Sequence, residues 1–174
     1  MLQEDPLLDT KSKNYTKIKI YNIQNYTPGQ SLNLGVQKST KKFVMIMSAH
    51  CVLRLINEKK IINNLKNYVC LFGKQTPILF GKKITKRYIW SHFHKKKIIN
   101  YFSDLEGRYF LHNAIAVYNK DILKKYPFDP HLSTKEDRYW AQQIVKKKFK
   151  YLYYPELEVD HHYTTAGNTW KGIA

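Results

Sequence analysis

Two adjacent carboxylates, Glu136 and Asp137, are well placed in this sequence for acid–base chemistry. Ser133 stands three residues before Glu136, a capping-box spacing that predicts a helix beginning at Ser133. In that helix Asp137 shares one face with the apolar side chains at i+3, i+4 and i+7, which are Trp140, Ala141 and Ile144. A carboxylate on this inward face could act as a general base. The alternative is structural: Thr134 caps the helix, and Asp137 only favours its N-terminus through the helix dipole.

Two histidines, His50 and His161, follow segments that read as strands. His50 closes the turn Ser48-Ala49-His50, directly after the apolar run 43–47. Ligands of open α/β sheets bind beyond the carboxyl ends of the strands, so His50 stands where chemistry is expected. The alternative is that Ser48 caps a helix and His50 is an incidental polar residue. His161 follows an aromatic strand candidate and a second extended run, which lie at 151–154 and 156–159.

The segments that must position these residues alternate between strand and helix patterns. We predict strands at 17–23, 43–47 and 68–72, helices at 31–40, 51–65 and 121–126, and a buried segment at 110–118. The continuous apolar run 43–47 is typical of a central parallel strand covered on both faces. Gly35, inside a predicted helix, would allow a close backbone approach. The alternation predicts a single α/β domain over residues 1–174, with a mostly parallel central sheet.

Two stretches interrupt this alternation. Residues 1–13 are polar and carry little structural signal, and residues 81–107 mix basic and aromatic side chains without a clear period. We expect the second stretch to be a mobile loop on the acceptor side of a site. Its pair His92-x-His94 has a spacing that would suit a metal on a strand, but no cysteine or carboxylate stands close by in the sequence.

The composition bounds the class of protein. The chain has 174 residues, is 43% hydrophobic and contains two cysteines, which favours one globular domain in a reducing compartment such as the cytoplasm. No stretch has the apolar length of a membrane span. The net charge of +17 invites a nucleic-acid-binding interpretation. The lysines are scattered in pairs and triplets, however, which favours a solvated surface that would also suit an anionic membrane or a nucleoside diphosphate.

Several motifs, taken in order along the chain, resemble one known family. They are Gly29-Gln30-Ser31-Leu32-Asn33-Leu34-Gly35, Phe43 to Cys51 (FVMIMSAHC), Gly73-Lys74-Gln75-Thr76-Pro77, Asn113-Ala114, and the segment from Glu136-Asp137 through Trp140-Ala141 and Tyr153-Tyr154-Pro155-Glu156 to His161. This order resembles the family 2 glycosyltransferases of the GT-A fold, in particular the rhamnosyltransferase-like enzymes of bacterial surface polysaccharide synthesis. The resemblance implies a Rossmann-like layered fold and an inverting transfer from a nucleotide-sugar donor to a glycan or lipid-linked acceptor.

The resemblance also implies a role for each matching residue. Asp137 would be the catalytic base, with Glu136 beside it. His50 stands where the family's Asp-x-Asp motif has its second aspartate, and His161 matches a later histidine, so both would hold a divalent metal, manganese or magnesium. Imidazole suits manganese better than magnesium. The donor diphosphate would contact Asn33, Gly35 and Ser48, and the acceptor side would include Gln75, Asn113 and Trp140.

The sequence departs from the family at its N-terminus. Family members begin with a strand, a helix and a strand that hold the nucleotide base, whereas here only a remnant near Asp9-Thr10 is similar. We expect a GT-A-like domain that lacks at least one βαβ unit of about 30 residues. Three hypotheses follow: an active glycosyltransferase, an inactive truncated transferase fragment, and a basic nucleic-acid-binding protein. The ordered motifs favour a transferase over the nucleic-acid-binding protein.

Overall fold

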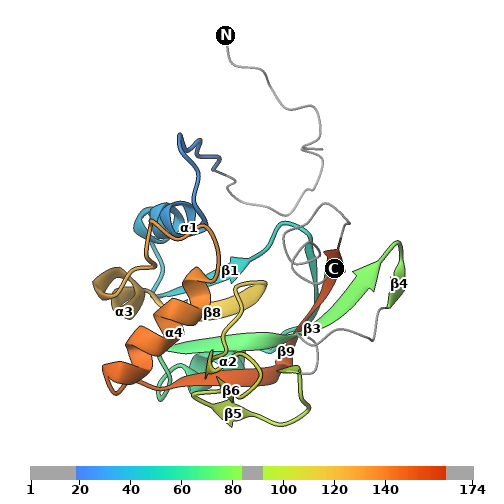
Figure 1. Cartoon of the computed structure of the whole chain (residues 1–174). Coiled ribbons are helices and arrows are strands. Elements are labelled where there is room, and N and C mark those ends of the chain that lie inside the picture. Colours follow the sequence, from blue (N-terminus) through green and yellow to red (C-terminus); the bar gives the residue numbers. More distant parts are fainter. Residues whose placement is uncertain (1–18, 84–91, 164–174) are drawn as a thin grey trace.

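The computed structural model describes residues 19–83 and 92–163, which form a sheet with helices on both faces (Figure 1). The helices are α1 (Pro28–Lys38), α2 (Glu58–Asn64), α3 (Lys120–Lys125) and α4 (Glu136–Lys146). The long strands are β1 (Phe43–Met47), β2 (Cys51–Leu55), β3 (Cys70–Leu79), β8 (Ile115–Asn119) and β9 (Tyr151–Tyr163). Four strands of two residues each complete the set: β4 (Lys82–Lys83), β5 (Ile98–Ile99), β6 (Phe102–Ser103) and β7 (Arg108–Tyr109).

The main sheet has the strand order β1-β8-β3-β9-β2, with β4 on β3 and β5 on β9. One face packs against α1, α3 and α4 through a core that includes Val36, Leu123 and Trp140. The other face packs against α2 through Ile61 and Leu65. The mixed α/β layered fold expected from the sequence is confirmed. None of the helices in the described residues is long and apolar enough to cross a membrane.

The long strand β9 bends in its middle. Tyr154 pairs with Gly73 and Glu158 pairs with Lys74, so the register shifts across residues 155–157. Gly73 is needed at this bend, because a Cβ there would meet the carbonyl oxygen of Leu157 at 2.4 Å. Beyond the bend β9 pairs with β2 on its other side, which sets His161 opposite Cys51. The bend therefore brings His161 beside the turn that follows β1.

The strand directions differ from the prediction. Among the described strands only β3 and β9 run parallel, over the longest ladder of the sheet, and the remaining pairings are antiparallel. β1 stands at one end of the strand order and pairs with β8 alone among the described strands, so its predicted central position is wrong. Met45 and Met47 on β1 stay exposed. An apolar run shows that a strand packs on a core, but not how many neighbours it has.

Several predicted elements change their bounds. The segment 51–65 is not one helix, because β2 occupies its first residues and Asn57 caps α2 after it. Helix α1 begins at Pro28, capped by the side chain of Thr27, rather than at residue 31. Residues 19–23 form no strand, and residues 17–18 lie outside the described part of the chain. Part of the predicted acceptor loop, 84–91, also lies outside it, whereas the remainder contains the short strands β4, β5 and β6 between turns.

Candidate active site

The Glu136–Asp137 pair opens helix α4 and is buried, with 8% and 4% of each residue exposed. The predicted capping box is wrong: Lys135, with a φ of 62°, is the N-cap residue and makes no side-chain cap bond. Asp137 does face inward with Trp140, as the spacing predicted. The pair is thus held by contacts with a distant segment of the chain, not by a local cap.

Asp137 is surrounded by hydrogen-bond donors. Its Oδ2 accepts the backbone N–H of Asn113 at 3.0 Å, and its Oδ1 accepts the backbone N–H of Arg138 at 2.8 Å. The guanidinium of Arg138 also contacts Oδ1, through Nη1 at 3.1 Å. Each oxygen of this carboxylate thus accepts at least one hydrogen bond from a fixed donor. Asp137 is therefore buried with a fixed orientation.

Glu136 lies in a different environment. Its Oε1 accepts a hydrogen bond from Nδ2 of Asn113 at 3.2 Å, and the hydroxyl of Tyr118 donates to Oδ1 of Asn113 at 2.6 Å. Burial and the neighbouring charge of Asp137 raise the pKa of Glu136 above its ordinary value. Two adjacent carboxylates with different environments are an arrangement suited to moving a proton.

Three imidazoles gather beside these carboxylates. The ring centroids of His50 and His161 are 4.5 Å apart, and those of His112 and His161 are 6.2 Å apart. Burial, with the neighbouring histidines, lowers the pKa of His161 to about 2. Burial also lowers the pKa of His50 and, with the added effect of Arg138, that of His112. All three rings are therefore neutral at pH 7, the form in which imidazole binds a metal.

The segment 112–114 connects the imidazoles to the carboxylates. His112 faces His161, Asn113 donates to both carboxylates, and the carbonyl of Ala114 accepts the backbone N–H of Ser48 at 3.1 Å. The turn after β1, the end of β9 and the start of α4 thus meet at the residues that lead into β8. His50 and His161 contact each other and are linked to the carboxylates through residues 112–114, and we take this cluster as the candidate active site.

The tautomers of two histidines follow from their hydrogen bonds. Nδ1 of His161 lies 2.6 Å from Oε1 of Gln75, an acceptor, so the ring carries its proton on Nδ1 and has a lone pair on Nε2. In His112 the roles are reversed, because Nδ1 accepts the backbone N–H of Ala114 at 3.2 Å. His161 is therefore arranged as a metal ligand oriented by Gln75, a pattern common in metal sites, whereas His112 is not.

The other predicted site residues have different surroundings. Asn33, on α1, bonds the backbone N–H and carbonyl of Phe128 with its side-chain amide, which fixes α1 to that segment. Gly35 is exposed, and a Cβ there would meet nothing within 4 Å, so the expected close approach is not at Gly35. α1 precedes β1 and the Ser48–His50 turn follows it, so these residues stand at opposite ends of that strand. No described contact joins Asn33 or Gly35 to the histidines.

Trp140 and Gln75 are buried rather than open to an acceptor. Trp140 is 2% exposed, packs against Tyr118 and Phe128, and donates its indole N–H to the carbonyl of Tyr126 at 2.6 Å. Gln75 is 2% exposed beside His161. The predicted acceptor-side role therefore does not suit Trp140, and Gln75 orients an imidazole instead. Asn113 is the one residue of that predicted set that contacts the carboxylates.

Three residues at the cluster were not predicted from the sequence: His112, Arg138, and Glu106, whose carboxylate contacts Nε of Arg138 at 3.0 Å. Arg138 and Glu106 are separated by 32 residues, and no local pattern joins them. His112 directly precedes the Asn113-Ala114 motif, and Arg138 directly follows the carboxylate pair. For His112 and Arg138, this adjacency to a motif residue was the one feature of the sequence that could have indicated a place in the site.

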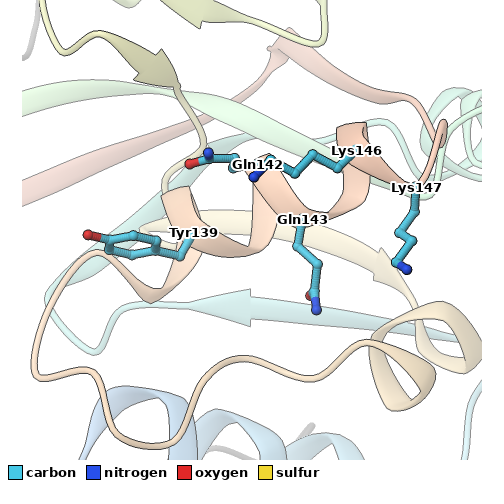
Figure 2. Close-up of a pocket in the computed structure, with 5 residues that line it drawn as sticks. All are labelled: Tyr139, Gln142, Gln143, Lys146 and Lys147. Atoms are coloured by element: carbon cyan, nitrogen blue, oxygen red, sulfur yellow. The ribbon is translucent and has the colours of Figure 1, made fainter.

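A hollow of about 520 Å³ lies elsewhere, along the outer face of α4. Figure 2 shows its five lining side chains, four on this helix and the last on its C-cap residue: Tyr139, Gln142, Gln143, Lys146 and Lys147. None of them is a predicted site residue, and Asp137 faces the opposite way, toward the core. The hollow is thus separate from the carboxylate and imidazole cluster.

A metal at the cluster would rest on His50 and His161. The described residues contain no group of three or more His, Cys, Asp or Glu side chains arranged to hold a metal ion. The pair still has the right chemistry, since both rings are neutral and Gln75 orients His161. Protein imidazoles can supply part of a coordination shell that a diphosphate and water complete.

Comparison with known proteins defines the fold. No protein-family model matches the chain, and no curated protein matches it significantly. Among solved structures the chain is similar to the crystal structure of GalNAc-T7 with UDP, GalNAc and Mn2+, with a TM-score of 0.61 and 14% sequence identity. The match covers 88% of this chain and 33% of the GalNAc-T7 chain, so this chain spans about a third of that length. GalNAc-T7 is a glycosyltransferase of the GT-A fold, and the described part of this chain has a GT-A-like α/β fold.

Proposed function

We propose that this chain is a glycosyltransferase domain that moves a sugar from a nucleotide-sugar donor to a glycan or lipid-linked acceptor. The observation that carries the proposal is the convergence of a buried carboxylate pair and neutral imidazoles on the segment 112–114. This convergence occurs in a GT-A-like fold whose similar structure, GalNAc-T7, was solved with UDP, GalNAc and Mn2+.

The reaction is a single inverting displacement. Asp137 takes the proton from an acceptor hydroxyl as that oxygen forms a bond to the anomeric carbon of the donor sugar. The bond from the anomeric carbon to the donor phosphate breaks on the opposite face, and the nucleoside diphosphate leaves with the electron pair. The N–H groups of Asn113 and Arg138 fix the orientation of the Asp137 carboxylate before the acceptor arrives.

A divalent cation, manganese or magnesium, is the cofactor of this proposal. When bound, it would offset the negative charge that develops on the leaving diphosphate. His50 and His161 would hold it, and Gln75 keeps the ligating nitrogen of His161 unprotonated. Two imidazole ligands favour manganese, the metal in the GalNAc-T7 structure.

We place the acceptor in bacterial surface polysaccharide synthesis, such as lipopolysaccharide or capsule, on the resemblance of the ordered motifs to the rhamnosyltransferase-like enzymes. Cys51 and Cys70 are both free thiols, which suits a cytoplasmic location. The net charge of +17 would favour peripheral contact with an anionic inner membrane face.

The proposal is tested by release of nucleoside diphosphate from a panel of nucleotide sugars, beginning with UDP-sugars, by the wild-type chain and by Asp137→Asn. Since a general base contributes about 100-fold or more, Asp137→Asn should lower the rate by at least that factor. Asp121→Asn, on the exposed side of α3, is the matched control and should keep the wild-type rate.

Two results would contradict the proposal. Full activity of Asp137→Asn would remove Asp137 as the base. No release by the wild-type chain from any donor, with manganese or magnesium present, would instead support an inactive transferase fragment.

A further inference from the structure

Arg138 makes a set of contacts that reaches from Asp137 to the β6–β7 hairpin. Its guanidinium contacts both carboxylate oxygens of Glu106, through Nε at 3.0 Å and Nη2 at 3.3 Å. Nη1 contacts Oδ1 of Asp137 at 3.1 Å and the carbonyl of Leu111 at 3.3 Å. The group also lies 5.0 Å from the ring centroid of Phe110. Arg138 is only 7% exposed, so these contacts fix one geometry.

Glu106 is itself held in place by the turn of the hairpin. Its backbone N–H donates to Oγ of Ser103 at 3.0 Å, and its carbonyl accepts from Nε of Arg108 at 3.2 Å. Ser103 in turn contacts the buried ring of His92. The carboxylate of Glu106 therefore reaches Arg138 from a rigid turn. A two-oxygen contact with a guanidinium is stronger and more directional than a contact with one oxygen.

Two carboxylates, of Glu106 and Asp137, contact this one guanidinium, and the charge of a third, Glu136, interacts with it. Arg138 divides its charge between Glu106 and Asp137, and its charge also favours the ionised form of Glu136. In a poorly hydrated cluster, each of these charges affects the protonation of the others more than it would in water.

We propose that Arg138 and Glu106 are positioning residues for the Glu136–Asp137 pair: Glu106 holds Arg138, and Arg138 fixes the orientation of the Asp137 carboxylate beside Glu136. This inference deepens the proposed function and rests on it for its catalytic meaning. It also assigns a task to the β6–β7 hairpin, which lies mostly in the region expected to face the acceptor. The hairpin supplies the anion that keeps Arg138 from pairing with Asp137 alone.

The remaining titratable groups around the pair come from the elements packed against α4. Tyr118 on β8 bonds Asn113, and burial, then the neighbouring Cys70, Asp137 and Glu136, raise its pKa well above the ordinary value. His112, before β8, faces Arg138 and stays neutral. Neither group gains or loses a charge near pH 7. Substitutions of Glu106 and Arg138 therefore change the charge around the pair without interference from these groups.

The inference is tested by the pH dependence of donor turnover in Glu106→Gln, Arg138→Gln and Arg138→Lys. Glu106→Gln removes an anion that opposes ionisation of the pair. The acid limb of the pH–rate profile, where turnover falls as the pH is lowered, should therefore move to lower pH. Arg138→Gln removes the cation that favours ionisation, so the acid limb should move up by about one unit or more. Arg138→Lys keeps the positive charge but loses the paired N–H groups that contact both oxygens of Glu106. It should restore most of the wild-type dependence of turnover on pH.

A matched control and an activity-independent measurement accompany the series. Glu156→Gln also removes one ion-paired carboxylate, but its partners are Lys60 and Lys97, so the limb should not move. Titration of the ¹³C-labelled carboxyl groups of Glu136 and Asp137 by NMR, assigned with Glu136→Gln and Asp137→Asn, reports the same shifts without any turnover.

The outcomes are distinct. Opposite shifts in Glu106→Gln and Arg138→Gln support the inference. Equal loss of rate at every pH, with unmoved carboxyl titrations, would give the two residues a purely structural role and overturn it. If the wild-type chain has no turnover, the proposed function fails, and the NMR titrations still decide whether Glu106 and Arg138 control the pair. If Arg138→Gln does not fold, the sign of the shift in Glu106→Gln decides alone.

Discussion

His161 should make the protein lose stability in mild acid, and the size of the effect follows from its burial. Burial, and then the neighbouring His112, His50 and His162, lower its pKa from 6.5 to about 2. The folded chain therefore keeps this ring neutral, whereas the unfolded chain protonates it below pH 6.5. The stabilisation is fully present above that value and is lost as the pH falls toward 2. Between pH 7 and pH 5 the expected loss of unfolding free energy from His161 alone is about 2 kcal/mol.

Urea unfolding followed by far-UV circular dichroism at pH 7 and pH 5 measures this loss. Between pH 7 and pH 5 the unfolding free energy of the wild-type chain should fall by about 2 kcal/mol more than that of His161→Gln, because the glutamine has no proton to gain. The absolute stability of the variant at pH 7 does not enter, since the comparison uses the difference between the two pH values. His131→Gln, which removes an exposed imidazole before α4, is the control for loss of a histidine. An equal pH dependence of wild type and His161→Gln would refute the reasoning.

Three further substitutions test the fold that positions the site. Gly29→Ala should destabilise the chain by about 1–3 kcal/mol in urea unfolding, because its Cβ would meet the backbone oxygen of Asp129 at 2.2 Å. Gly35→Ala on the same helix should instead stabilise it by about 1 kcal/mol, because its Cβ meets nothing within 4 Å and alanine favours a helix; a loss of stability would contradict this. Trp140→Phe should cost about 1–3 kcal/mol by leaving the carbonyl of Tyr126 without its indole donor, and should leave donor turnover unchanged; a large loss of turnover in a folded variant would restore Trp140 to the acceptor side.

The inward direction of Asp137 could be predicted because it depends on local spacing alone. Helical periodicity fixes which side chains share a face, so Asp137 and Trp140 had to point the same way. The start of the helix could not be predicted in this way. Ser133 has the sequence of a cap, but Lys135 takes the N-cap position, and Asn113 supplies the bonds to the carboxylates. A contact from 24 residues away thus outweighed the local signal.

The sheet shows the same limit for strands. The run 43–47 does form a strand, but its place in the strand order depends on which strands pair beside it, which a single segment does not encode. Pro155 suggested a break between two extended runs, whereas the structure keeps one strand with a register shift at that point. That shift, accommodated by Gly73, is what carries His161 to His50.

In the candidate site too, residues within motifs could be predicted from the sequence, whereas residues joined by long-range contacts could not. The motif residues form two contacting pairs, His50 with His161 and Asn113 with Asp137, and the segment 112–114 connects the pairs. The charges that regulate them, on Glu106 and Arg138, required the structure, because ion pairs between distant segments leave no periodic trace in a sequence.

Thermal unfolding of the purified chain with nucleoside diphosphates, with and without Mn²⁺, tests most directly the claim that this cluster serves a donor nucleotide. A ligand that binds the native state raises the unfolding midpoint by mass action, and a concentration of about 100 times Kd stabilises by about 2.7 kcal/mol. The account predicts that one nucleotide, with UDP tested first, raises the midpoint in a Mn²⁺-dependent manner, and that His50→Ala removes the Mn²⁺ dependence. No shift with any nucleotide, with or without the metal, would contradict it.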